Sequence, residues 1–364
     1  MHHPIICFIF RPVYGSPQID LIIVGQGLAG SAVAMRALAR DYKILVLDEP
    51  AGNRSSRMAA GLFNPFTGRK MVKTWLADEI FPSLYLYYSE VEDLTEKRFF
   101  YDIPIYRPFG NIKEQNEWMA KSADSDYQNY ISGLSATSGF NGKVNDPFGG
   151  ITLKQTGYLD TQTYLEAVRE YLEVRGSYRV QIFDADKLEI GDNWVRYENL
   201  TARKVVFCQG VQNTSNHWFR DLPLISLKGE FLTVQSEWKK DVILNRGVYM
   251  VPSAHPDTWR VGATYNRKDH RPEITSWARN ELTHKLEELI RMPYAVTGQQ
   301  WGVRPTTPDQ KPIIGAHPKY DSLIIFNGLG TKGVSLAPYF SEVLIRWLEK
   351  KGTINKEADV TRFI

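Results

Sequence analysis

The sequence predicts an α/β fold in which one sheet is parallel and a second sheet is mostly antiparallel. An apolar run at 21–24 leads into a glycine turn and a helical pattern at 31–40. A second apolar run at 44–47 then ends on Asp48. This order of strand, glycine turn, helix and strand is typical of a Rossmann-like unit that binds a dinucleotide. Strand-rich runs that favour the antiparallel sheet lie at 227–234, 248–251 and 260–263.

The glycine turn has the spacing that a pyrophosphate requires. We expect Gly25 to permit the tight turn, Gly27 to let a phosphate approach the backbone, and Gly30 to let the helix pack against its strand. Leu28 and Ala29 open the helix, whose unpaired N–H groups carry a partial positive charge. The turn therefore predicts a phosphate-binding site.

Asp48 lies at the end of the second strand, about 20 residues after the turn, where a carboxylate accepts hydrogen bonds from ribose hydroxyls. Glu49 follows it. We expect Asp48 to contact an unphosphorylated ribose and Glu49 to be a further cofactor contact.

Further elements follow from apolar periodicity. Residues 115–150 are polar, and we expect a surface excursion or lid there. Residues 1–18 are expected to form an N-terminal extension that precedes the folded domain. We expect helices at 71–92, 161–174, 276–291 and 339–350, and strands at 99–108, 180–183, 194–197, 204–208 and 323–326.

Composition narrows the functional class. The chain has 364 residues, of which 43% are hydrophobic. Its net charge is +3, from 44 basic and 41 acidic residues. This near-neutral charge argues against nucleic acid or an anionic membrane as a partner. Cys7 and Cys208 form neither a disulfide framework nor a zinc spacing, so no metal is expected. No apolar run is long enough to span a membrane, and we expect a cytoplasmic protein that acts on a small molecule.

Five stretches, taken together, carry a resemblance to a known family. They are the glycine motif at 24–48, Ser-Ser-Arg-Met-Ala-Ala-Gly-Leu at 55–62, Val-Val-Phe-Cys-Gln-Gly at 205–210, the segment at 301–315 that contains Trp-Gly-Val-Arg-Pro, and Gly-Leu-Gly-Thr-Lys-Gly within 328–338. In this order they resemble the D-amino-acid oxidase family of FAD enzymes, which includes glycine oxidase and the sarcosine oxidases. The resemblance implies an FAD-binding domain at 19–95, 151–225 and 305–364. A substrate-binding domain on a mostly antiparallel sheet would comprise 96–150 and 226–304.

The same resemblance implies which residues hold FAD. Lys332 either adds a positive charge near the flavin or is a solvated loop lysine. Gly302 stands where members with covalent flavin carry a cysteine, so we expect noncovalent FAD. Besides the glycine turn with Asp48 and Glu49, the expected contacts are Ser56, Arg57, Ala60, Gly61, Gly210, Arg304, Gly328, Gly330, Thr331, Lys332, Gly333 and Val334.

Arg304 is the main candidate for binding the substrate, because a guanidinium matches a carboxylate in two parallel hydrogen bonds. Considered apart from the family resemblance, an Arg-Pro pair most often marks a turn with an exposed arginine. Tyr249 is either a pocket residue, as the resemblance implies, or a core aromatic. Trp301 and Tyr265 are further pocket candidates.

The resemblance implies oxidation of the C–N bond of a small amine or amino acid by hydride transfer to flavin N5, with an imine that hydrolyses. The electron acceptor is oxygen, a quinone or another carrier. We nominate no general base, because the flavin carries the chemistry. Two alternatives stay open. One is an oxidase that acts on a carboxymethylamino-uridine of tRNA, and the other is a flavin subunit of a multi-subunit dehydrogenase.

Overall fold

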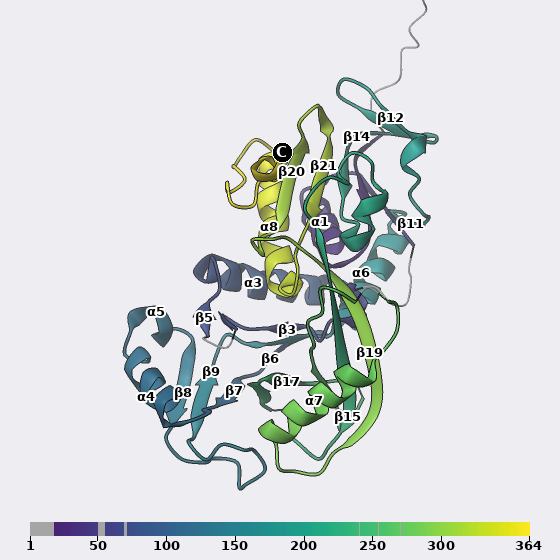
Figure 1. Cartoon of the computed structure of the whole chain (residues 1–364). Helices are drawn as coiled ribbons and strands as arrows, with labels where there is room; N and C mark the ends of the chain where they lie inside the picture. The colour runs from purple at the N-terminus through teal and green to yellow at the C-terminus, as the bar shows by residue number, and fades with distance from the viewer. Residues whose placement is uncertain (1–17, 50–54, 69–70, 240, 254, 270) are drawn as a thin grey trace, which may run out of the picture.

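The protein is described by a computed structural model that covers residues 18–49, 55–68, 71–239, 241–253, 255–269 and 271–364. Two large sheets organise these residues, one in the upper and one in the lower part of Figure 1. All but Gln18 of the predicted N-terminal extension lies outside the described residues.

The first sheet contains the predicted parallel unit. Its strands follow the order β11-β2-β1-β14-β13-β12, with β21 paired to β14 and β20 to β21. The pairs β11–β2, β2–β1, β1–β14 and β14–β21 are parallel, and the others are antiparallel. The strands span β1 Ile19–Val24, β2 Ile44–Asp48, β11 Tyr178–Val180, β12 Leu188–Ile190, β13 Val195–Tyr197, β14 Leu200–Phe207, β20 Ile313–His317 and β21 Tyr320–Asn327.

Alternating residues of the buried parallel strands face opposite sides of this sheet. On β1, Leu21 and Ile23 pack against the helical side, whereas Ile22 and Val24 pack against residues 183–224 and the C-terminal turn. The helices that contribute buried residues to the helical side are α1 Leu28–Leu38, α3 Ala77–Thr95, α6 Thr161–Val174 and α8 Gly333–Leu348. The predicted Rossmann-like α/β unit is confirmed.

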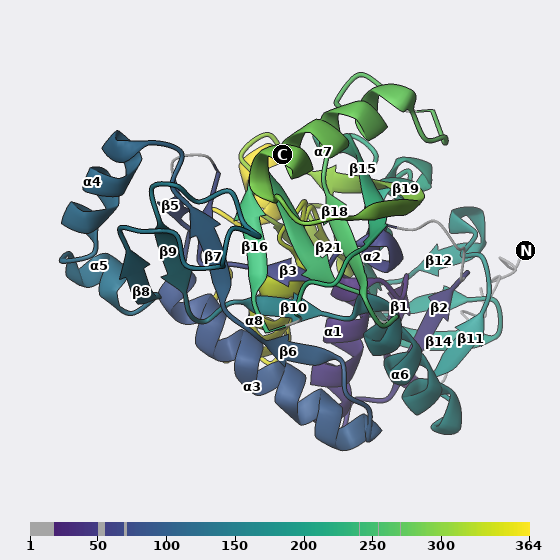
Figure 2. The ribbon, with the colours of Figure 1, turned by 90° about the horizontal axis from the view of Figure 1, so that it is seen from below.

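The second sheet is antiparallel except for one parallel pair, β16–β7. Helix α7 Ser276–Leu289 covers one face, where Leu282 and Leu286 contact Leu232 and Trp259 within one buried cluster. Figure 2 shows α7 lying along this sheet. Its strands, in spatial order, are β19 Ala295–Thr306, β15 Ile225–Gln235, β18 Thr258–Gly262, β17 Val248–Pro252, β16 Ile243–Arg246, β7 Ile105–Pro108, β9 Gly150–Leu153 and β8 Ile131–Ser135.

Smaller elements complete the fold. They are the sheet β3 Leu62–Phe63, β10 Gly157–Leu159 and β6 Phe100–Asp102, the hairpin β4 Phe66–Thr67 with β5 Val72–Lys73, the helices α2 Ser55–Met58, α4 Ile112–Lys121 and α5 Ser125–Gln128, and the 3-10 turns at Ala185–Lys187, Gly210–Ser215 and Val360–Phe363. The predicted division into two domains stays a prediction, although the second sheet draws its strands only from 105–153 and 225–306.

The prediction of a surface excursion or lid at 115–150 needs correction, because the segment buries more than its polarity indicates. This segment forms most of α4, α5 and β8, and it buries Trp118, Tyr130 and Val144. The few apolar residues are spaced so that they meet the second sheet and its neighbours, and the polar residues between them stay outside. The segment is therefore a packed edge of the fold.

Several predicted boundaries also need correction. The helix predicted at 71–92 begins at Ala77, because Val72–Lys73 pairs with β4. The strand predicted at 99–108 is two strands in different sheets, separated around Pro104, and the strand predicted at 180–183 lies at Tyr178–Val180. The helix predicted at 339–350 begins six residues earlier, at Gly333.

The early start of α8 depends on an unusual hydrogen bond. Pro338 lies inside the helix and has no N–H, so it leaves the carbonyl of Val334 without its partner four residues on. The hydroxyl of Tyr88, on α3, donates to this carbonyl at 2.9 Å. Both Tyr88 and Val334 are buried, so the hydroxyl replaces the missing backbone donor.

We expect Tyr88→Phe to lower the free energy of unfolding by about 1–3 kcal/mol, because it leaves a buried carbonyl unsatisfied. Pro338→Ala restores the N–H, so the same Tyr88→Phe change is expected to be much less destabilising in that background. Urea denaturation of the four proteins of this double-mutant cycle measures the difference. An equal loss in both backgrounds would contradict the assigned role of the hydroxyl.

Candidate active site

A cavity of about 740 Å³ lies where the two sheets meet. The glycine turn after β1, the loop around Ser56 and the turn before α8 form one side, and strands of the second sheet form the other. The charged side chains that line it in the described part of the chain are Arg107, Arg304 and Lys332, and none is a carboxylate. This set of charges favours an anionic ligand.

A second cavity, of about 350 Å³, lies on the other side of the glycine turn. Val24, Gly25, Asp48, Glu49 and Gln181 are among the residues that line it. The two cavities therefore flank the turn, with the predicted phosphate-binding residues at one and the predicted ribose-binding residues at the other.

Two glycines of the turn serve close packing. A Cβ at Gly25, where φ is +98°, would lie 2.7 Å from the carbonyl oxygen of Cys208. A Cβ at Gly30 would lie only 1.8 Å from the carbonyl oxygen of Gly25. Gly27, Leu28 and Ala29 line the larger cavity instead, at the start of α1.

Ser56 completes the cradle at the start of α1. Its Oγ accepts a hydrogen bond from the Leu28 N–H at 3.1 Å, and a Cβ on Gly27 would lie 2.9 Å from that oxygen. Ala60 and Gly61, from the same loop, also line the cavity. Arg57 does not line it, because its side chain turns toward Glu166, with a 3.8 Å Nη1–Oε1 distance.

The Ser56 loop is attached to both halves of the molecule through the carbonyl oxygen of Ala59. Arg260 on β18 donates to it from Nη1 at 2.6 Å, and Thr161 at the start of α6 donates from Oγ1 at 3.2 Å. Burial lowers the pKa of Arg260.

On the other side of the turn, the Asp48 carboxylate accepts the Gln26 N–H at 3.0 Å.

Arg304 projects from β19 into the cavity. Its guanidinium lies against Gly229, where an added Cβ would be 2.1 Å from Nη1. That Nη1 is buried and has no hydrogen-bond partner among the described residues. Tyr265 stacks beside the group, with 5.4 Å between Cζ and the ring centroid. A buried donor without a partner, in a cavity, is suited to bind an anionic group.

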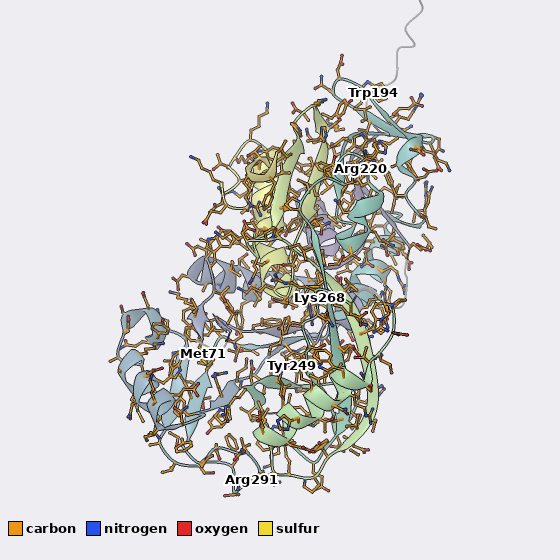
Figure 3. The ribbon with its side chains drawn as sticks, in the orientation of Figure 1. Met71, Trp194, Arg220, Tyr249, Lys268 and Arg291 are labelled. Carbon is orange, nitrogen blue, oxygen red and sulfur yellow. The ribbon has the colours of Figure 1, made fainter. Side chains whose placement is uncertain are left out.

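Tyr249 also faces the cavity, and Figure 3 shows it on the part of the second sheet nearer the first. Burial raises the pKa of Tyr249 to about 12, although the nearby Arg304 charge opposes part of the shift. Tyr265 lies at the mouth and is 64% exposed. Trp301 does not line the cavity, because its odd-numbered position on β19 turns it to the face opposite Arg304.

The turn before α8 supplies the remaining wall. Thr331, Lys332, Gly333 and Val334 line the cavity, as do Gly210 and Gly330. Burial lowers the pKa of Lys332, so this lysine is not a fully solvated one. Gly328 does not line the cavity, because it packs on Thr307, whose methyl carbon would lie 2.9 Å from an added Cβ.

Position 302 holds a glycine and not a cysteine. Gly302 packs beside Met58, whose Cβ would lie 3.1 Å from a Cβ added at Gly302. Within the described ranges no cluster of His, Cys, Asp and Glu could hold a metal ion. In the same ranges, no helix combines the length and apolarity that crossing a membrane requires.

Three residues at the site were not predicted from the sequence. Arg107 and Asn245 line the cavity, and Gly229 packs against the Arg304 guanidinium. Gly229 interrupts an otherwise strand-like run, which is a known sign of a close approach by another group. Arg107 and Asn245 gave no local signal, because only the pairing of distant strands places them at the cavity.

Comparison with known proteins supports this reading. A family profile described as FAD dependent oxidoreductase (DAO) matches residues 20–347. Among related sequences, the tRNA 5-methylaminomethyl-2-thiouridine biosynthesis bifunctional protein MnmC of Legionella pneumophila (strain Corby) is 22% identical over 93% of this chain and 54% of its own length. The D-amino acid dehydrogenase of Helicobacter pylori (strain 26695) is 24% identical over 69% of this chain and 64% of its own length. The chain thus spans only about half the length of the MnmC relative.

Solved structures share the fold. Glycine oxidase from Geobacillus kaustophilus superposes with a TM-score of 0.78 at 18% identity, covering 95% of this chain and 99% of its own. Iminodiacetate oxidase from Chelativorans sp. BNC1 gives a TM-score of 0.76 at 14% identity, over 93% and 98%. With a profile match that extends over most of its length, the chain belongs to the DAO family of FAD-dependent oxidoreductases.

Proposed function

We propose that this protein oxidises the C–N bond of a small carboxylated amine or amino acid. The observation that carries the proposal is the buried Nη1 of Arg304, which has no partner in the described chain and points to an anion in the cavity. FAD, when bound, would accept the hydride from the carbon that bears the nitrogen, and the resulting imine would hydrolyse in water. Oxygen, a quinone or another carrier would then take the electrons.

The residues around both cavities fit FAD. The N–H groups of Gly27 and Ala29 at the start of α1 suit the pyrophosphate, because a helix N-terminus attracts anions, and the Leu28 N–H holds Ser56 Oγ beside them. Asp48 and Glu49 line the adjoining cavity and suit the adenosine ribose. Lys332 and the N-terminus of α8 supply positive charge that would stabilise an anionic reduced cofactor. Gly302 is consistent with noncovalent binding.

The lining side chains position the substrate and do not act as a base. Arg304 would orient the carboxylate, with Tyr265 shielding one side of its guanidinium. Tyr249, with a pKa of about 12, stays neutral near pH 7 and can donate a hydrogen bond. The lining positions described contain no Asp, Glu or His. The cationic lining instead disfavours an ammonium, so it lowers the pKa of the substrate amine and favours its reactive neutral form.

Relatives support the substrate class through the names they carry. They include a D-amino acid dehydrogenase, a glycine oxidase and an iminodiacetate oxidase. The compounds in these names share an amine close to a carboxylate, which is the pair of groups that the cavity charges suit.

A second candidate function is oxidation of a carboxymethylamino group on a tRNA uridine. It is favoured by the MnmC relative, which aligns with 93% of this chain. The near-neutral net charge of +3 opposes it, because a tRNA backbone requires a basic face.

We expect Gly27→Ala to weaken FAD binding by about 5- to 30-fold, which corresponds to roughly 1–2 kcal/mol. The added Cβ would lie 2.9 Å from Ser56 Oγ and enter the phosphate cradle. Gly139→Ala is the matched control, because its Cβ would meet no atom within 4 Å. Equal FAD dissociation constants for the two variants, measured by flavin fluorescence, would contradict the assigned cradle.

Replacing Arg304 by Met should raise KM for a carboxylated amine by about 10- to 200-fold, the usual worth of charged hydrogen bonds. KM for the corresponding amide should change little. Anaerobic bleaching of the flavin and steady-state kinetics measure both, and Arg304→Lys should recover only part of the loss. The control is Arg98→Gln, at an exposed arginine that pairs with Glu92 and lines neither of the two cavities. An unchanged KM for the carboxylated amine would refute this role.

The tRNA alternative predicts retention of the holoenzyme on immobilised tRNA at low salt, with affinity that falls steeply as salt rises. The small-amine proposal predicts no retention under these conditions together with turnover of a free amine. A filter-binding titration across salt concentrations separates the two.

A further inference from the structure

We propose that Lys228 is a positioning residue for carboxylate binding and that it acts through Tyr265 on Arg304. The inference rests on the proposed function, because it concerns how the same site binds the anionic end of its substrate. Lys228 is 1% exposed and is not among the residues that line the cavity. Its contacts nevertheless hold the loop that places an aromatic ring against the substrate-binding guanidinium.

The guanidinium of Arg304 is held in place by packing and not by polar contacts. Among the residues that the structure describes, no hydrogen bond or ion pair fixes it, and its Nη1 is buried without a partner. It packs against the ring of Tyr265, at 5.4 Å from Cζ to the ring centroid, and against the bare backbone at Gly229. A long side chain loses rotamer entropy when a ligand fixes it, so packing that orients it beforehand strengthens binding.

Backbone pairing places the ring of Tyr265 beside this guanidinium. Asn266, just after β18, and Lys228 on β15 exchange two N–H···O hydrogen bonds, at 2.9 and 3.0 Å. In this antiparallel register the preceding residue, Tyr265, lies opposite Gly229. Both Tyr265 and Arg304 line the cavity, so the ring and the guanidinium lie together over the open space at Gly229.

The side chain of Lys228 fixes the same loop from the other face of the sheet. Because side chains alternate along β15, Lys228 and Glu230 point away from the cavity, whereas Gly229 faces it. Lys228 Nζ donates to Asp269 Oδ2 at 2.9 Å and lies 4.0 Å from Glu230 Oε1. Hydrogen bonds from Arg271 and Lys228 hold the pKa of Asp269 well below its usual range. The carboxylate that the lysine binds is therefore ionised near pH 7.

The turn that follows Tyr265 transmits this contact to the ring. The side-chain oxygen of Asn266 accepts the N–H of Asp269 at 3.0 Å, so the two ends of the turn are joined. Asn266 is next to Tyr265 in the chain. A lysine on one face of β15 thus determines where a ring lies on the other face. Without Lys228, we expect the turn and the ring to move away from Arg304.

The experiment uses acetate as its probe, because acetate carries the carboxylate and no amine. It is titrated into the holoenzyme and followed by the change in flavin absorbance, with acetamide as the uncharged control. Arg304→Met gives the affinity that remains without the guanidinium. We expect Tyr265→Leu to weaken acetate binding by about 3- to 20-fold, the usual range for a cation–π contact. Tyr265→Phe keeps the ring and should stay within about twofold of the unaltered protein.

Lys228→Met tests the positioning role. On its own it should weaken acetate binding by about 3- to 20-fold, but by less than about twofold in the Tyr265→Leu background, where the ring through which it acts is absent. KM for a carboxylated amine should rise by the same factor, with kcat and the FAD dissociation constant within about twofold of their original values. Lys187→Met, at an exposed lysine that pairs with Glu198 at 3.5 Å, is the control and should change none of these quantities.

The inference is overturned if Lys228→Met leaves acetate binding unchanged, or weakens it equally with and without the Tyr265 ring. Acetate binding that Arg304→Met does not weaken overturns it as well. Should Lys228→Met fail to fold, Asp269→Ala takes its place with the same expectations, because it removes the partner of the lysine on the loop. Failure of the proposed function looks different, because then no amine is oxidised, whereas the pattern of acetate affinities remains.

Discussion

The structure depends on one carbonyl oxygen, that of Ala59. Arg260 reaches it from the second sheet and Thr161 reaches it from the helix beside the first sheet. The same short loop presents Ser56 to the start of α1 and brings Gly61 so close to Leu159 that an added Cβ would lie 1.8 Å from its carbonyl oxygen. Because one loop touches both sheets, their relative position and the shape of the cavity between them are determined together.

The charge of the cavity has a thermodynamic consequence. Arg107, Arg304 and Lys332 line it without a carboxylate among the described lining residues, and burial disfavours the charged form of Lys332. Cations in a partly buried site lose part of their hydration. The anionic cofactor and the proposed anionic substrate would offset this penalty, so ligands that bind only the folded protein would also stabilise it.

The sequence predicted well what depends on local geometry. The turn at Gly25–Gly30, the carboxylate of Asp48 and the arginine of β19 all lie where their motifs indicated, and Arg304 lines the cavity. Prediction from the sequence failed where contacts between residues far apart in the chain determine the structure. Tyr88 allows a helix to run through Pro338, and strand alternation turns Trp301 away from the cavity. Arg107 reaches the cavity only through the pairing of β7 with β16, which no local pattern indicates.

Because Gly229 and Arg304 are in close contact, the residue at one position limits which residues fit at the other. The guanidinium lies in space that any side chain at 229 would fill, since even a methyl group would lie 2.1 Å from Nη1. A larger residue at 229 would push the guanidinium out of this position, so we expect the glycine to accompany the arginine wherever the arginine keeps this orientation. If Arg304 binds a carboxylate as proposed, the pair would serve as a marker for sorting substrate preference across relatives.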